Sequence, residues 1–135
     1  MVIAVLERID HIGIAVDDLD AALVTWERLG LIEAKIETIE DQGVRVAMLK
    51  VGDGKVELLA PLGPDTPVGR FLARKGPGLH HVAFRVDDIE AALVEARSRG
   101  LELIDETPRL GAGGARIAFL HPRAAGGTLV ELCQR

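Results

Sequence analysis

The chain has 135 residues, of which 48% are hydrophobic and 27% charged, and its formal net charge at pH 7 is −5. This length predicts a single domain, residues 1–135, and no apolar run reaches the roughly 18 to 20 residues of a membrane span, so we expect no membrane partner. The acidic balance argues against a nucleic-acid partner, and the single cysteine excludes an intrachain disulfide and fits a reducing compartment.

Residues 1–8 lack the charged leader and small-residue cleavage site of a signal peptide, so we expect a cytoplasmic protein.

The first predicted elements follow directly on this stretch. Residues 11–16 alternate between large apolar side chains and small or polar ones, which is the pattern of a half-buried strand. A helix with one apolar stripe follows, capped by Asp17 or Asp18 and ended by Gly30.

Three strands and a linker come next. The strands are predicted over residues 31–36, 44–51 and 55–60. The last two are joined by Gly52-Asp53-Gly54, a strong hairpin signal. The linker covers about residues 61–76, is rich in proline and glycine, and contains a helix-like piece over residues 68–75.

The second half of the chain repeats the first. The strand, Asp-Asp pair and helix that begin at His11 return 70 residues later at His81, and the Val-Glu-Leu run at Glu57 returns at Glu131. Each half is therefore read as a βαβββ module. The modules span about residues 7–60 and 77–134. The predicted fold class is α+β, with the two modules forming a concave, mostly antiparallel eight-stranded sheet.

Each module carries one histidine near its start and one glutamate on its last strand, namely His11 with Glu57 and His81 with Glu131. Taken singly, a strand glutamate is more often a solvated edge residue, and a strand histidine is more often a hydrogen-bonded structural group. Matched positions in a duplicated module are not expected by accident. Imidazole and carboxylate together suit Zn²⁺, Mn²⁺, Co²⁺, Ni²⁺ or Fe²⁺, with positions left open for a substrate.

Paired βαβββ modules with this ligand set resemble the vicinal-oxygen-chelate, or glyoxalase, superfamily, in which a divalent metal binds two neighbouring oxygens of the substrate. More narrowly, the chain is similar to methylmalonyl-CoA epimerases. That similarity spans nearly the whole chain and rests on Ile9-Asp10-His11-Ile, Gln42-Gly43-Val44, Val56-Glu57-Leu-Leu-Ala60-Pro61-Leu62-Gly, Phe71-Leu72-Ala, Gly78-Leu79-His80-His81-Val-Ala-Phe, Leu110-Gly111-Ala-Gly-Gly, Phe119-Leu120-His121-Pro122 and Gly127-Thr-Leu-Val-Glu131-Leu132.

The resemblance implies an isomerase that interconverts the (R) and (S) forms of methylmalonyl-CoA by removing the C2 proton, through a metal-stabilised enolate. It implies that His11, Glu57, His81 and Glu131 bind the metal (Co, Mn, Ni or Zn), that some members have glutamine at the position of Glu57, and that Glu131 is a catalytic base. Where some members place a second glutamate, this chain has Val46. The second base is therefore open between Glu57, a metal-bound water and a one-base swing of the substrate. A CoA thioester partner and a homodimer are further implications.

Three other functions compete with this one. A glyoxalase I-type lactoylglutathione lyase resembles the same scaffold, but the His-Pro hairpin and the Leu-His-His strand favour the epimerase. An extradiol dioxygenase needs only two histidines and one carboxylate, so a fourth ligand at Glu57 counts against it. A metal-free small-molecule-binding protein on the same fold would have no reason to retain all four ligands.

Some other chemically notable residues are not assigned to the ligand set. His80 is expected on the opposite strand face from His81, and Cys133 is expected to be a small buried side chain rather than a reactive thiol. Residues 111–114 predict a turn, because no helix start follows them as it would in a phosphate loop. Basic side chains that suit CoA phosphates, but more often form a solvated surface, are Arg70, Arg74, Lys75, Arg116 and Arg123.

Overall fold

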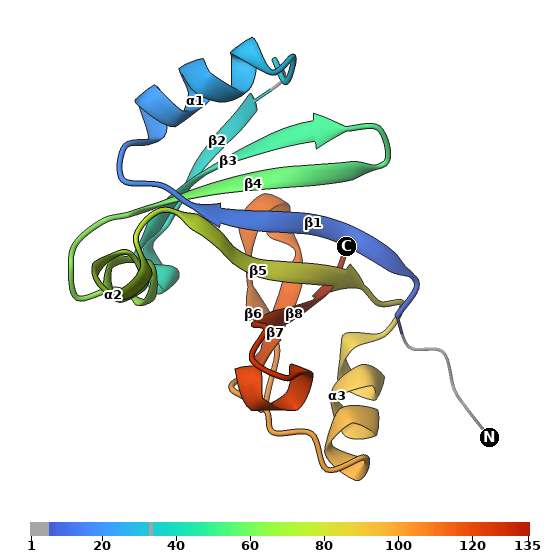
Figure 1. Ribbon diagram of the computed structural model, residues 1–135. Helices are drawn as coiled ribbons and strands as arrows, with labels where there is room; N and C mark the ends of the chain where they lie inside the picture. Colours follow the sequence, from blue (N-terminus) through green and yellow to red (C-terminus); the bar gives the residue numbers. More distant parts are fainter. Residues whose placement is uncertain (1–5, 33) are drawn as a thin grey trace. The chain divides into compact units, whose positions relative to one another are not determined.

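The structure, a computed structural model, describes residues 6–32 and 34–135 (Figure 1). The first five residues, which are part of the stretch examined for a signal peptide, lie outside the described residues. The chain forms two compact units. We call His11–His80 the first unit, and we call His81–Arg135 together with the segment up to Asp10 the second unit. No helix among the described residues is long and apolar enough to cross a membrane.

The first unit contains a four-stranded sheet in the order β2-β3-β4-β1. The α-helices and strands of this part of the chain are β1 (Arg8–Ala15), α1 (Leu19–Arg28), β2 (Ala34–Ile39), β3 (Val44–Val51), β4 (Gly54–Pro61) and α2 (Pro67–Lys75). Strand β3 pairs antiparallel with β2 and β4, whereas β1 pairs parallel with β4. The first and last strands of the unit therefore lie side by side.

The second unit repeats this arrangement in the order β5-β8-β7-β6. Its α-helix and strands are β5 (Gly78–Arg85), α3 (Ile89–Ser98), β6 (Arg109–Leu110), β7 (Arg116–Leu120) and β8 (Val130–Gln134). Strand β7 is antiparallel to β6 and β8, whereas β5 is parallel to β8. The predicted α+β class and the two βαβββ patterns are confirmed within the described residues, and antiparallel pairs outnumber parallel ones in both units.

The helix caps settle choices that the sequence left open. Asp18 accepts hydrogen bonds from the backbone N–H groups of Asp20 at 3.0 Å and Ala21 at 3.2 Å. Asp88 caps α3 in the same way, through the N–H of Ala91 at 3.1 Å. Capping carboxylates satisfy N–H groups that have no partner within the helix, so the second aspartate of each Asp-Asp pair fixes where the helix begins.

The prediction that the strand after the first helix begins at Leu31 is wrong. Gly30 takes φ 101°, and the backbone N–H of Leu31 donates to the carbonyl of Trp26 at 3.1 Å, so Leu31 still belongs to the closing turn of α1. Its side chain, like that of Trp26, packs against the apolar core cluster of the first unit. The strand β2 can begin only after this turn, at Ala34.

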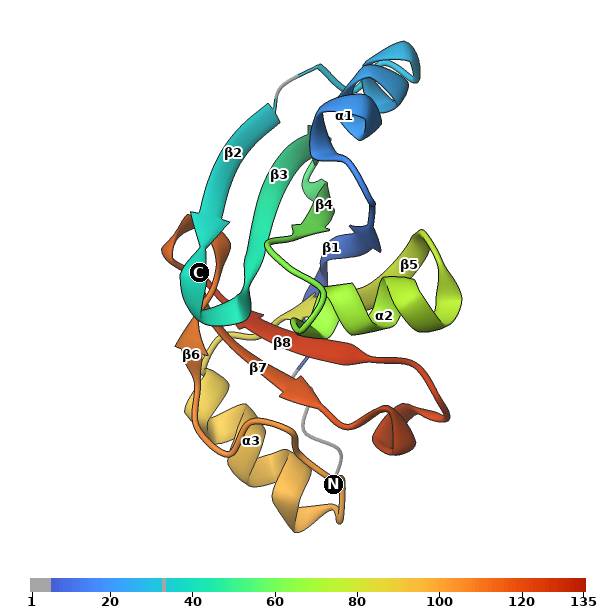
Figure 2. The ribbon, with the colours of Figure 1, turned by 90° about the vertical axis from the view of Figure 1, so that its left-hand side faces the viewer.

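One helix covers one face of the sheet in each unit (Figure 2). Leu19 of α1 packs with Leu49 and Leu58, and Leu93 of α3 packs with Leu132. Because successive side chains of a strand point to opposite faces, the residues next to Leu58 and Leu132 face away from these helices. The glutamates of the candidate site are therefore held on the sheet face opposite the helix.

Candidate metal centre

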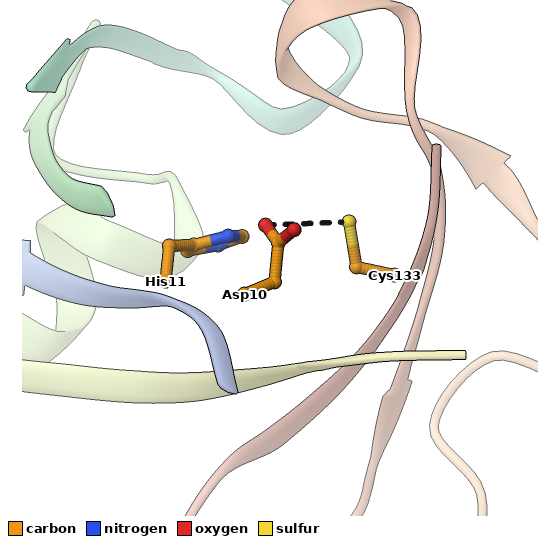
Figure 3. A group of neighbouring side chains, drawn as sticks. All are labelled: Asp10, His11 and Cys133. Carbon is orange, nitrogen blue, oxygen red and sulfur yellow. Dashed lines mark hydrogen bonds between the residues drawn. The ribbon is translucent and has the colours of Figure 1, made fainter. Parts of the chain in front are cut away.

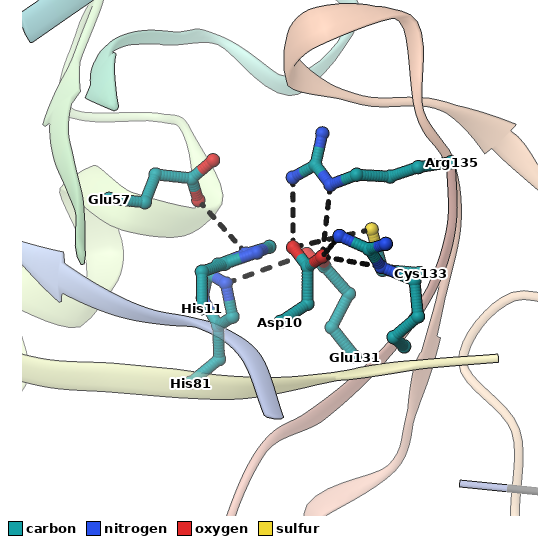
Figure 4. Close-up of polar contacts among 8 residues, drawn as sticks. Asp10, His11, Glu57, His81, Glu131, Cys133 and Arg135 are labelled. Atoms are coloured by element: carbon teal, nitrogen blue, oxygen red, sulfur yellow. Dashed lines mark hydrogen bonds and ion pairs between the residues drawn. The ribbon is translucent and has the colours of Figure 1, made fainter. Parts of the chain in front are cut away.

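His11 and Glu57 face each other across β1 and β4 in the first unit. The strand register places Gly13 opposite Glu57, and Gly13 shares a strand face with His11 two residues before it. Because Gly13 has no side chain, the carboxylate reaches the imidazole, and Nε2 of His11 lies 3.7 Å from Oε1 of Glu57 (Figure 4). Both residues are buried, at 3% and 6% exposure.

His81 and Glu131 are paired by the same construction in the second unit. Here Ala83, two residues after His81, lies opposite Glu131 in the parallel register of β5 and β8. Nε2 of His81 lies 3.5 Å from Oε1 of Glu131, and both residues are only 3% exposed. The ring of Phe119 meets the His81 ring edge-on, with 5.5 Å between centroids. In both units, a small residue leaves room for the glutamate beside the histidine.

The spacing within each pair fits two ligands of one metal ion. A nitrogen and an oxygen each about 2.1 Å from one ion, at a tetrahedral angle, are about 3.4 Å apart. The observed separations of 3.7 and 3.5 Å are close to that value and longer than the usual N–H···O hydrogen bond. Imidazole and carboxylate are also the donor types that divalent transition metals prefer. The four predicted residues thus form two metal-compatible pairs, and their convergence on one ion stays a prediction.

A buried carboxylate that the sequence reasoning missed lies one residue before His11. Asp10 has 0% exposure, and its Oδ1 accepts from Nε and Nη2 of Arg85 at 2.9 and 2.7 Å. Arg135 donates from Nε to Oδ1 at 2.9 Å and from Nη2 to Oδ2 at 2.8 Å (Figure 4). A signal was available, because Arg85 is the large side chain at the position where the first module has Ala15.

Cys133 belongs to the same cluster. Its Sγ donates to Oδ2 of Asp10 at 3.7 Å (Figure 3), and the residue has 0% exposure, as expected for a small buried side chain. Burial raises the pKa of the Cys133 thiol to about 12, and the negative charge of Asp10 adds to the rise. The thiol therefore stays protonated at neutral pH and serves Asp10 as a donor, not as a nucleophile.

The chain matches known proteins over most of its length. The model of the Glyoxalase/Bleomycin resistance protein/Dioxygenase superfamily matches residues 10–119. The chain is 38% identical over 131 residues to the mitochondrial methylmalonyl-CoA epimerase of Homo sapiens, covering 96% of this chain and 74% of that protein. The chain belongs to the methylmalonyl-CoA epimerase family.

Two further members of the epimerase family match over almost their full length. The ethylmalonyl-CoA/methylmalonyl-CoA epimerase of Cereibacter sphaeroides is 38% identical over 131 residues, covering 94% of this chain and 97% of that one. A variant of the Streptomyces coelicolor methylmalonyl-CoA epimerase, in complex with 2-nitronate-propionyl-CoA, superposes with a TM-score of 0.93 at 42% identity. That alignment covers 96% of this chain and 94% of the other.

Val46 lies where the resemblance implies a second glutamate in some members of the epimerase family. It is 1% exposed and lies between Glu37 of β2 and Leu59 of β4 in the strand register. An apolar side chain cannot transfer a proton, so the glutamate that the resemblance places here in other members has no counterpart at this position.

His80 has a different environment from His81. Its ring packs edge-on against Phe71 of α2, with 4.9 Å between ring centroids. Burial lowers the pKa of His80 to about 4, and the positive charge of Arg74 adds to the effect. His80 is therefore neutral at physiological pH.

This environment predicts how stability depends on pH. The pKa of His80 falls from 6.5 in the unfolded chain to about 4 in the folded one. The contribution of His80 to the stability of the fold is therefore present above pH 6.5 and is lost as pH falls toward 4. We expect the free energy of unfolding, measured in urea, to fall between neutral pH and about pH 4.5 in both proteins. The fall should be about 2 kcal/mol larger in wild type than in the His80→Gln variant. An identical pH dependence of the two proteins would contradict this assignment.

Two of the basic residues considered for CoA phosphates form surface ion pairs. Arg116 donates to Glu90 at 3.1 Å, and Arg123 donates to the two carboxylate oxygens of Glu102 at 3.3 and 2.9 Å. The hydrogen bond from Arg123 also lowers the pKa of Glu102.

Residues 111–114 form the expected turn and lead into the strand β7 rather than an α-helix.

Proposed function

We propose that this protein is an isomerase that interconverts the (R) and (S) forms of methylmalonyl-CoA. The single observation that carries the proposal is the pair of buried His/Glu sites, built in the same way in both units of a chain that belongs to the methylmalonyl-CoA epimerase family. Epimerisation requires that the proton on C2 be removed and then returned from the other side. The C2 carbon lies between a thioester carbonyl and a carboxylate, so its proton is acidic enough for a positioned base.

His11, Glu57, His81 and Glu131 together hold one divalent metal ion in this proposal, and Co, Mn, Ni and Zn all suit these donors. When bound, the metal supplies Lewis-acid stabilisation for the negative charge that develops on the substrate as C2 loses its proton. The support lies in the donor types, in their spacing within each unit, and in their matched positions in the repeat.

Glu131 is the residue that we propose for proton transfer. The residue is 3% exposed, so little water competes for the proton that its carboxylate takes. Its backbone is fixed on both sides, because Glu131 pairs with Ala83 of β5 and with Phe119 of β7. A carboxylate on a rigid strand, beside an imidazole that orients it, meets the geometric needs of a general base.

Solvent deuterium uptake tests this function. The metal-loaded protein is incubated with methylmalonyl-CoA in D₂O, separately with Co²⁺, Mn²⁺, Ni²⁺ and Zn²⁺, and the C2 proton signal is followed by NMR. We expect that signal to disappear with at least one metal. After rigorous chelation the signal should stay.

The competing functions give different results in the same assay. A glyoxalase I would leave the C2 proton in place and act on a glutathione hemithioacetal. A binding protein would take up the thioester without exchange. Exchange that continues undiminished after chelation would refute the metal-dependent mechanism.

A further inference from the structure

The buried carboxylate of Asp10, with its partners Arg85, Arg135 and Cys133, has no part in the proton transfer proposed above. We propose that Asp10 is a positioning residue, which ties the end of β5 to the end of β8 and thereby sets the placement of His81 against Glu131. This inference rests on the proposed function, because it assigns a purpose to the His81–Glu131 pair.

The cluster lies on the same strand faces as the pair. Residues two or four apart share a face of a strand, so Arg85 follows His81 on one face of β5, and Cys133 follows Glu131 on one face of β8. Arg135 is the residue directly after β8. The register places Arg85 opposite Cys133, two residues beyond the Ala83 and Glu131 partners. The cluster therefore joins β5 and β8 just beyond the His81–Glu131 site along both strands.

The bonding is suited to fixing geometry. Arg85 and Arg135 each donate two hydrogen bonds to one carboxylate, which constrains direction as well as distance. The two guanidinium groups come from β5 and from the residue that follows β8, and they meet on an Asp10 carboxylate with 0% exposure.

Stability alone does not account for such a cluster. A buried ion pair seldom makes a protein more stable than well-packed apolar side chains of similar volume would, because the buried charge loses its hydration. Directional bonding is what the charged cluster adds over an apolar one. That contrast supplies the experiment.

The test compares three proteins with wild type. The Asp10→Asn variant removes the charge and keeps the shape. A triple variant, Asp10→Leu with Arg85→Met and Arg135→Met, replaces the three charged members of the cluster by apolar side chains. It also serves as the test if the Asp10→Asn variant does not fold. Leu93→Ala is the control, because it weakens the core of the same unit beneath α3, on the opposite sheet face.

Each folded protein is examined in two ways. Steady-state C2 exchange gives kcat and KM, and the imidazole resonances of His81 are recorded in the metal-free protein. We expect kcat to fall about 10- to 100-fold in the Asp10→Asn and triple variants at unchanged KM, because small misplacements of reacting groups have effects of this size. The His81 resonances should shift in both, whereas Leu93→Ala should keep the wild-type kcat and resonances.

The inference is overturned if the folded triple variant keeps the wild-type kcat and His81 resonances. It is also overturned if activity falls only in proportion to the unfolded fraction, as it would for a purely structural residue. If wild type itself exchanges no C2 proton, the proposed function fails, and the His81 resonances alone then decide whether Asp10 positions this histidine.

Discussion

Replacing Glu131 by glutamine is expected to lower kcat for C2 proton exchange by about 10³-fold, the size of a lost general base. The glutamine amide keeps the shape of the side chain and a carbonyl oxygen that can bind a metal. This oxygen lies beside His81, whose Nε2 is 3.5 Å from the carboxylate in wild type. It removes the group that accepts the proton. The rate of C2 deuterium incorporation in D₂O measures the effect, with the protein saturated in metal and substrate.

Glu57→Gln is the matched control for this prediction. The same chemical change is made in the equivalent pair of the first unit, and the family resemblance implies that glutamine serves as a ligand at this position in other members. We expect a decrease of less than about 10-fold, because the carbonyl oxygen still coordinates. An equal loss in both variants would assign proton transfer to Glu57 as well, and no loss in Glu131→Gln would remove Glu131 from the mechanism.

Replacing His81 by alanine is expected to weaken metal binding by more than about 100-fold and to abolish exchange. Even partners that only orient a metal ligand change affinity about 10- to 100-fold when they are removed, so a direct ligand should have a larger effect. Isothermal titration of the metal-free protein with Mn²⁺ or Co²⁺ gives the affinity without reference to activity.

The neighbouring histidine gives a close control. His80→Ala removes an imidazole one residue away, where the ring packs on Phe71 rather than facing Glu131. Its metal affinity should match that of wild type. If His80→Ala loses the metal and His81→Ala keeps it, the ligand assignment on β5 is wrong.

The sequence predicted what depends on local pattern. Alternation and capping residues located the strand that carries His11 and the helices that begin after Asp18 and Asp88. The repeat identified the two glutamates, because each stands at a matched position of a βαβββ module. These features depend on neighbours that are close in sequence or on the duplication itself.

The rest depended on contacts that no local pattern encodes. Asp10 meets its two arginines across 75 and 125 residues of chain, and strand alternation gives the face of a residue but not its partner. The start of β2 depended on the hydrogen bond from the N–H of Leu31 to the carbonyl of Trp26, which closes the turn after α1 beyond Gly30. Both follow from tertiary packing and helix termination rather than from composition.

The parallel pairing of the first and last strands of each βαβββ module has a consequence for how the protein acquires activity. His11 and Glu57 are 46 residues apart in the chain, and His81 and Glu131 are 50 apart. Closing a loop of this length costs chain entropy, so each pair forms only when the parallel pairing of its two strands is in place. Metal uptake should consequently be a late event in refolding, and the gain of affinity should report completion of the native topology rather than collapse of the chain.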